Sequence, residues 1–125
     1  MDYLIAEGYR PTIDSDGDVV FKHEGRTYYI EIDTNDEQFF RIVFPNFWSV
    51  ESEEELARVI LAANYATMKT KVAKVYLRSD SKDTVASVEM FFGRPEHFKE
   101  GFRRAMSALQ AGVNNFIEKV HQAPN

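Results

Sequence analysis

The chain has 125 residues, of which 44% are hydrophobic, and a net charge of −5. This length favours a single domain over residues 1–125, and the apolar content excludes a disordered chain. Cysteine is absent, so disulfides, thiolate metal sites and cysteine nucleophiles are excluded, and the composition fits a cytoplasmic protein. We expect no membrane association, because no apolar run approaches the roughly 20 residues that cross a bilayer. The first residues also lack the pattern of a signal peptide.

Charge is divided unevenly along the chain. Residues 1–55 carry a net charge of −10, and residues 56–125 carry +5. The acidic first half would repel nucleic acid, so we expect no nucleic-acid partner. The asymmetry could serve pairing between subunits or complementarity within the chain. Solvated faces that happen to differ in sign would look the same, and we favour that interpretation.

The first half predicts short elements that follow one another closely. They are a helix, an edge strand, a turn and three strands, at residues 2–8, 9–13, 14–18, 19–24, 27–33 and 39–44. Asp2 is the expected N-cap of the helix. Apolar and polar residues alternate along the three strands, which is typical of half-buried strands. Their short connections, one of them the Glu24-Gly25 turn, require antiparallel pairing.

The turn before the first of these strands resembles a calcium loop, because Asp14, Asp16 and Asp18 alternate in it. The match fails in two places. Gly17 stands at the fourth position of the loop rather than the sixth, and Gly25 stands at the twelfth, where a glutamate belongs. We therefore predict an ordinary acidic turn.

The clearest helix signal in the chain lies at residues 52–69. Ser52 is the expected N-cap, and Glu55, three residues later, completes a capping box. The expected apolar face consists of Leu56, Val59, Ile60 and Ala63. We expect both parts of the sheet to pack against this helix. The aromatic segment 44–50 is the expected connection that leads into it.

Two further strands and a long helix complete the predicted order. The strands are expected at 72–78 and 84–92, and the helix begins at Pro95. Gly101 and Gly112 each weaken that helix by about 1 kcal/mol relative to alanine. Such a glycine indicates either the close approach of a neighbouring segment or a tolerated accident.

The element order and three stretches of sequence resemble the YbjN-like family, described as proposed bacterial sensory transduction regulators. The stretches are DSDGDVVFKHEGRTYYIEI at 14–32, AANYATMKTKVAKVYL at 62–77 and VASVEMFFGRPEHFKEGFRRAMSAL at 85–109. The predicted fold is α+β, an antiparallel sheet with helices packed on one face, in the order α-β-β-β(-β)-α-β-β-α. In architecture the family is similar to type III secretion chaperones, which are small, acidic, dimeric proteins that bind polypeptides without chemistry. The resemblance implies no catalytic residues.

No catalytic, cofactor-binding or metal-binding set is expected from the sequence. The histidines His23, His97 and His121 lack the spacing of a zinc site. No nucleophile elbow or glycine-rich phosphate loop is present. Glu31 and Asp33 share a predicted strand face and could form an acid–base pair, but solvent-facing charges on a half-buried strand look the same.

A basic run with tyrosines nearby lies in the second half. It consists of Lys69, Lys71, Lys74, Arg78 and Lys82, with Tyr65 and Tyr76 close in sequence. Basic and aromatic residues together can follow a nucleic-acid backbone. This run crosses a helix end, a strand and a turn, so we favour a solvated face.

The candidate protein contacts are aromatic side chains, namely Tyr29, Phe39, Phe47, Trp48 and Phe91. Aromatic residues on an exposed sheet or loop are typical anchors of protein interfaces. The alternative is that the helices cover them as part of the core.

We therefore expect a cytoplasmic, non-enzymatic, protein-binding or chaperone-like regulatory module that forms a homodimer and uses no cofactor. The alternative is a small-molecule-binding regulatory domain with a pocket between the sheet and the C-terminal helix, with Asn64 and Tyr28 as polar groups. A hydrolase is the third hypothesis, and a deep cleft holding two close carboxylates or a histidine would be its sign.

Overall fold

The computed structural model describes residues 1–31, 35–36 and 38–122, and it confirms the predicted α+β order with four strands before the second helix. The elements are α1 (Asp2–Ala6), β1 (Thr12–Ile13), β2 (Val19–His23), β3 (Arg26–Glu31), β4 (Phe39–Ser49), α2 (Glu53–Lys69), β5 (Ala73–Leu77), β6 (Asp83–Phe91), a 3₁₀ turn (Pro95–His97) and α3 (Phe98–Val120). The prediction that Asp2 caps the first helix is wrong, because Asp2 lies inside α1, which has no side-chain cap.

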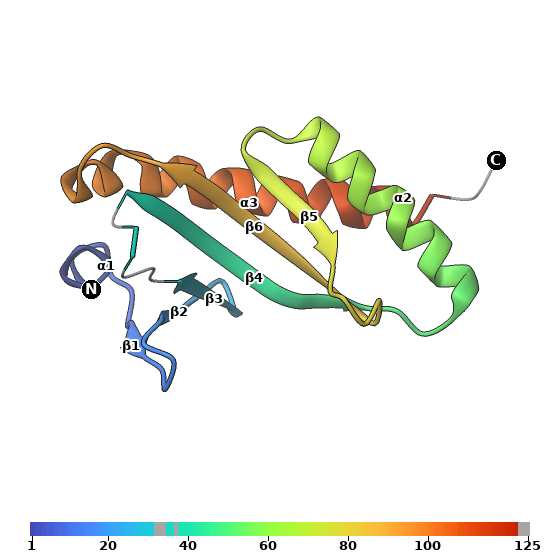
Figure 1. Cartoon of the computed structure of the whole chain (residues 1–125), viewed down its shortest axis with the longest axis horizontal. Coiled ribbons are helices and arrows are strands. Elements are labelled where there is room, and N and C mark those ends of the chain that lie inside the picture. Colours follow the sequence, from blue (N-terminus) through green and yellow to red (C-terminus); the bar gives the residue numbers. More distant parts are fainter. Residues whose placement is uncertain (32–34, 37, 123–125) are drawn as a thin grey trace.

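The strands form one six-stranded sheet in the order β1-β2-β3-β4-β6-β5, and every neighbouring pair is antiparallel (Figure 1). The tight turn between β2 and β3 is the predicted one. Glu24 and Gly25 both have positive φ, +52° and +80°. This combination matches the right-handed twist of a hairpin and favours glycine.

The helices α2 and α3 both pack on one face of the sheet, as predicted, but their roles differ from the expected ones. In Figure 1, α3 runs along β4 and β6, and α2 crosses its C-terminal part. The helix α3 packs against β4, β5 and β6, whereas α2 packs against α3 and β5. The expectation that α2 joins both parts of the sheet is therefore wrong, because the longer and more apolar stripe of α3 occupies that position.

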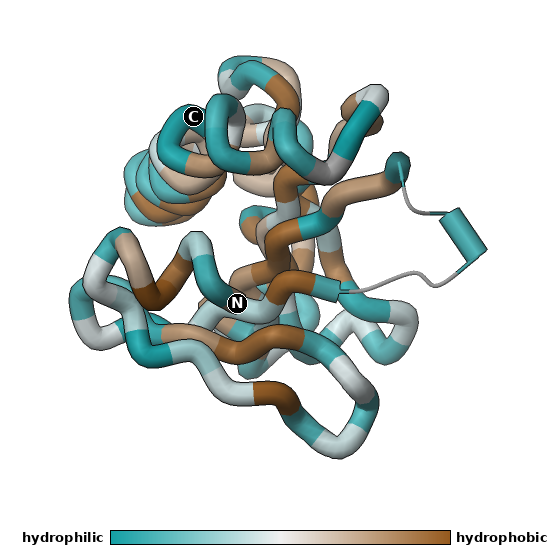
Figure 2. Tube along the Cα trace, turned by 90° about the vertical axis from the view of Figure 1, so that its left-hand side faces the viewer, coloured by the Kyte–Doolittle hydropathy of each residue, from teal (hydrophilic) through white to brown (hydrophobic). Residues whose placement is uncertain are grey.

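The core lies between α3 and the strands. Its largest fully buried aromatic side chains are Phe21 and Tyr28 from the β2–β3 hairpin and Phe102 and Phe116 from α3. Along β4 and β6 the core residues alternate with the charged residues Arg41 and Glu89 and with two valines, Val43 and Val85, that are also buried. Figure 2 colours the hydrophobic stretches of the trace brown. The alternating residues point to the other face of the sheet, which α2 and α3 do not cover.

The start of α2 is the one predicted, and its buried face is the predicted one at Val59 and Ala63 but not at Ile60. The Ser52 Oγ accepts a hydrogen bond from the Glu55 backbone N–H at 3.1 Å, which confirms the N-cap. The Glu55 carboxylate accepts the Trp48 Nε1–H at 3.2 Å instead of closing the capping box. Val59 and three alanines are buried, at 62, 63 and 66, whereas Ile60 is 50% exposed.

Residues 44–49 are strand rather than the expected connection. The strand β4 continues through Ser49, and its pairing with β6 shifts register between Pro45 and Ser49. Asn46 has φ of +54° at this irregularity. A β-bulge of this kind bends a strand and redirects its side chains. Here it turns Phe47 and Trp48 toward α3.

Candidate functional site

The candidate site is the face of the sheet opposite α2 and α3, which we call the open face. Side chains that are paired across strands lie on the same face. The pairs Glu31–Arg41 and Arg41–Glu89 therefore form one row over β3, β4 and β6. The pair Phe39–Phe91 forms a second contact two residues further along β4 and β6.

Arg41 is the centre of the charged row. Its guanidinium donates to the Glu31 carboxylate and to the Tyr76 hydroxyl, and its Nε lies 3.5 Å from Glu89 Oε1. Glu89 Oε2 also lies 3.0 Å from Lys74 Nζ and accepts the Ser87 hydroxyl at 2.9 Å. The row thus links β3, β4, β6 and β5 by alternating charges, which makes this part of the open face rigid.

Their hydrogen-bond and ion-pair partners keep both Glu89 and Arg41 charged. Burial by itself raises the pKa of Glu89, but hydrogen bonds from Lys74 and Ser87 and the charge of Arg41 outweigh it. The pKa of Glu89 therefore lies below its usual value. For Arg41, burial acts to lower the pKa, and the hydrogen bond to Glu31 reverses that effect, so the pKa is raised. Both groups are ionised near neutral pH.

Two phenylalanines extend this face at one end. The rings of Phe39 and Phe91 lie 5.7 Å apart, at an interplanar angle of 57°. The side chain of Phe91 is 75% exposed, whereas that of Phe39 is half-buried. The Phe92 N–H donates to the Gln38 carbonyl at 2.9 Å, so the backbone that carries this pair stays bonded to its neighbouring strand.

The structure separates the five predicted contact residues into two groups. Tyr29, Phe39 and Phe91 lie on the open face. Phe47 and Trp48 lie against α3, and their ring centroids are 5.2 and 5.8 Å from that of Phe116. These last two pack against the core, which is the alternative that the sequence left open.

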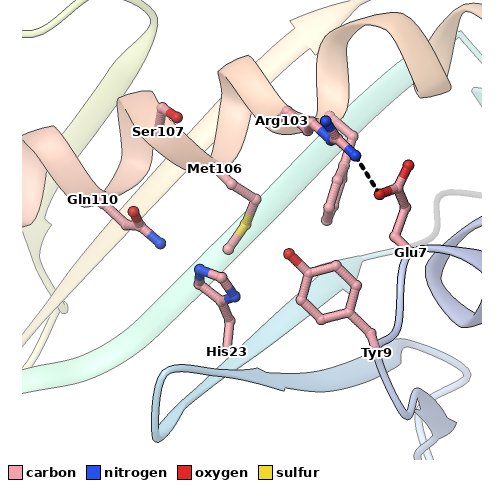
Figure 3. Close-up of a pocket in the computed structure, with 8 residues that line it drawn as sticks. Glu7, Tyr9, His23, Arg103, Met106, Ser107 and Gln110 are labelled. Atoms are coloured by element: carbon pink, nitrogen blue, oxygen red, sulfur yellow. Dashed lines mark hydrogen bonds and ion pairs between the residues drawn. The ribbon is translucent and has the colours of Figure 1, made fainter.

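A pocket of about 350 Å³ lies on the helix side, between the β2–β3 hairpin, the segment after α1, and α3 (Figure 3). His23 and Tyr9 line one side of it, and Met106 and Gln110 line the other. A pocket was expected in this region, but with other residues. Tyr28 is fully buried and Asn64 is exposed on α2, so neither is among its lining residues.

An ion pair forms one wall of this pocket. Arg103 donates to the Glu7 carboxylate at 2.6 Å, and this bond lowers the pKa of Glu7. Burial raises the pKa of Tyr9, and the negative charge of Glu7 adds to that effect. The Tyr9 hydroxyl is therefore neutral near pH 7 and can act as a hydrogen-bond donor.

The remaining ionisable candidates within the described residues lie on different elements of the fold. Glu31 binds Arg41, and Asp33, its expected partner, lies outside the described residues. His97 is exposed at the start of α3. The ring of His121 lies 5.4 Å from that of Trp48.

Carboxylates from Asp14, Asp16 and Asp18 lie within 4.8 Å of one another, the one such group of three potential metal ligands within the described residues. The Asp14 Oδ1 accepts the backbone N–H groups of Asp16 and Asp18, each at 3.0 Å. Those hydrogen bonds are typical of an acidic turn, which is the structure that the sequence predicted.

The predicted basic run is divided by the sheet. Lys74 binds Glu89 on the open face, and Arg78 Nε donates to Asn46 Oδ1 at 2.6 Å. Lys69 lies over the Tyr65 ring, 5.9 Å from its centroid, on the helix side. The run therefore does not form one continuous strip, which agrees with the preference for a solvated face.

Sequence reasoning missed the charged row and the residues that line the pocket of Figure 3. The row joins Arg41 to partners that are 10 and 48 positions away in the chain, so its detection requires the strand register. The sequence showed that Arg41 alternates with apolar residues in a predicted strand, but it did not show which residues pair with it. In the described part of the chain, no helix is long and apolar enough to span a bilayer.

The fold and the open face define a class, a small α+β domain with one helix-covered and one uncovered face of an antiparallel sheet. The chain is similar to a protein of Methanothermobacter thermautotrophicus described as uncharacterized, with a TM-score of 0.67 and 12% sequence identity, over 95% of this chain and 92% of the other. It is also similar to YbjN of E. coli, described as a proposed transcription regulator, with a TM-score of 0.67 and 9% identity, over 94% and 89% of the two chains.

These comparisons confirm the YbjN-like fold that the sequence suggested. At 9–12% identity they establish the fold alone. No family model and no curated protein sequence matches this chain.

Proposed function

We propose that the chain is a non-enzymatic, protein-binding regulatory module of the bacterial cytoplasm, and that the open face contacts the partner polypeptide. The observation that carries this proposal is the exposure of Phe91, which is 75% exposed and lies against Phe39. Burial of a phenylalanine side chain stabilises a complex by about 1.5–3 kcal/mol. The similarity of the fold to YbjN, described as a proposed transcription regulator, supports a regulatory role.

The charged row complements the aromatic pair. Exposed aromatic residues give an interface its affinity, and charges beside them select the partner. Arg41 and Glu89 are held by neighbours on both sides, so they present fixed positions rather than mobile side chains. Because these ionisable groups are paired with one another, they support binding rather than catalysis.

The test is the affinity of a partner for two matched variants. A partner is first recovered from the native host with the immobilised wild-type chain, then purified and titrated by calorimetry. We expect Phe91→Asp to weaken binding by at least about tenfold, because an interface anchor becomes a charge. The control Ile13→Asp alters another exposed apolar residue, on β1, which is 62% exposed, and should bind like the wild type. Equal affinities for all three chains would contradict the proposal.

We also propose that the module is a homodimer, as expected for an architecture like that of secretion chaperones. The apolar side chains exposed on α2, namely Ile60, Leu61 and Met68, support a contact between copies. Sedimentation equilibrium at micromolar concentration should give twice the mass of the chain. A monomer at that concentration would rule out the dimer without affecting the role of the open face.

The second candidate function is binding of a small molecule in the pocket of Figure 3, which places His23, Tyr9 and Gln110 around about 350 Å³ of space. A thermal-shift screen with metabolites tests it. A ligand of this pocket should raise the Tm of the wild type and of His97→Ala, but not that of His23→Ala. A screen in which no metabolite raises the Tm, while partner peptides do, would contradict this alternative.

A further inference from the structure

A second surface lies on the helix side of the sheet. It is a groove of about 700 Å³ between α3, the connection from α2 to β5, and the end of β6. Its position follows from the strand register. Ala73, the first residue of β5, pairs with Val88, so β5 does not extend alongside Met90. Met90 therefore lies in the groove, beside α3.

The floor of the groove is apolar and combines one methionine with several alanines. Met90 and Ala108 are half-buried there, and Ala105 is buried. Val72 forms one edge, and its side chain is 55% exposed. Its φ of +55° is unusual for a β-branched residue, which costs of order 1–3 kcal/mol. The floor therefore offers an apolar surface against which an apolar side chain of a partner can pack.

The rim of the groove is basic. Lys69, Lys71, Arg103 and Arg104 line it, and no acidic residue is among the lining residues. Arg103 is paired with Glu7. Within residues 1–31, 35–36 and 38–122, no carboxylate lies within 4.0 Å of Lys71 or Arg104. The groove therefore has a local positive charge in a chain whose net charge is −5.

The wall that carries these cations is fixed. The Asn115 side-chain amide of α3 donates to the Thr70 hydroxyl at 2.8 Å, which ties α3 to the end of α2. Gly112, one turn before, lies against Ala73. The spacing between Lys71 and the α3 rim is thus set by direct contacts, so a ligand would meet a groove that is already formed.

We infer that this groove binds a segment of a partner polypeptide in which an apolar side chain is flanked by aspartate or glutamate. The apolar floor receives the apolar side chain, and Lys71 and Arg104 receive the carboxylates. Nucleic acid fits less well, because single strands bind through aromatic stacking and the lining contains no aromatic residue. The inference does not depend on the open face, since Met90 and Phe91 point to opposite sides of β6.

A displayed library of random peptides tests the inference. Peptides are selected on the wild-type chain, synthesised with a fluorescent label, and titrated by anisotropy. We expect the selected peptides to carry aspartate or glutamate beside an apolar residue. We expect the double variant Lys71→Glu and Arg104→Glu to bind them at least about tenfold more weakly, because like charges face each other. The milder double variant, Lys71→Gln with Arg104→Gln, should have an affinity between those of the wild type and of the charge-reversed variant. Because it only neutralises the charges, it controls for misfolding of the charge-reversed chain.

The control variant reverses two positive charges at positions outside the groove. Lys22 and Lys82 are exposed and do not line the groove, so Lys22→Glu with Lys82→Glu should keep the wild-type affinity at the same ionic strength. Three results of the binding measurements would overturn the inference. They are selected peptides without acidic residues, equal binding to both charge-reversed variants, and a labelled oligothymidylate that binds more tightly than the peptides through Lys71 and Arg104. Self-association lost in the Lys71/Arg104 variant would assign the groove to a second copy and would also overturn it.

Discussion

Glu89 is the residue on which the charged part of the open face depends. Its carboxylate is shared by Lys74, Ser87 and Arg41, which come from three strands. An acidic side chain with this many partners is stabilised in its charged form. Its removal leaves Arg41, which is four-fifths buried, with a single carboxylate partner, Glu31.

Glu89→Gln should therefore lower the free energy of unfolding at pH 7 by about 1–3 kcal/mol. The pKa of Glu89 is depressed in the folded chain. Its stabilising effect is thus present above the usual glutamate pKa of about 4.3 and is lost as pH falls through the lower folded value. Urea titrations of the wild type and of Glu89→Gln between pH 7 and pH 3 measure the difference in their free energies of unfolding. A difference that stays constant over that range would contradict the assignment.

Gly101 and Gly112 are a matched pair within α3. A Cβ at Gly101 would meet no atom within 4 Å, whereas one at Gly112 would lie 3.3 Å from the Cβ of Ala73. The sequence left two interpretations open for each glycine. The structure shows that a neighbouring segment comes close at Gly112, whereas Gly101 has no such neighbour and is tolerated without a packing reason.

Gly101→Ala should raise the free energy of unfolding by about 0.5–1 kcal/mol, because alanine has the higher helix propensity. Gly112→Ala should give a smaller gain or a loss, because Ala73 must move to make room. Thermal or urea unfolding of both variants measures the difference. An equal or larger gain for Gly112→Ala would show that the contact between α3 and β5 is looser than described.

The elements differ in how far their own sequences determine them. Alternation located the strands, and it placed Phe91 on the face opposite Met90 and Phe92, because strand faces follow from local sequence. Helical spacing found only part of the buried face of α2, namely Val59 and Ala63. Its apolar residues surround the helix, and contact with α3 and β5 selects the alanines, which leaves Ile60 exposed.

The segment 44–49 failed as a prediction for a similar reason. Pro45 is unusual inside a strand because it cannot donate to the ladder, and Asn46 has a φ of +54° that a regular strand does not contain. The long partner β6 nevertheless pairs with this segment on both sides of the bulge, and Trp48 packs on Phe116, 68 positions later. Local sequence carries no information about contacts that distant.

The N-cap of α2 gives a testable prediction about the stability of a single helix. Ser52→Ala removes the hydroxyl that accepts the Glu55 N–H, so we expect the free energy of unfolding to fall by about 1 kcal/mol. Ser52→Asp keeps a side-chain acceptor at the N-cap and should retain the wild-type stability. Urea unfolding of the three chains decides between them. An alanine variant as stable as the aspartate variant would mean that the cap contributes nothing.

At the scale of the whole molecule, the sheet separates two kinds of surface. One side is covered by α2 and α3 and contains the core, and the other presents paired charges and the Phe39–Phe91 contact. The sequence predicted this one-sided arrangement and three of the aromatic residues on the open face. It could not reveal the groove beside Met90, because that space exists only where β5 ends next to α3.

The central claim is that Phe91 touches a partner polypeptide, and site-specific crosslinking measures this contact directly. The photoreactive residue p-benzoylphenylalanine replaces Phe91 in one chain and Ile13, on β1, in another, and both chains are irradiated in the native host. We expect a crosslinked protein from position 91 and none from position 13. A partner that copurifies with both chains but crosslinks only from position 13, or from neither position, would contradict the account.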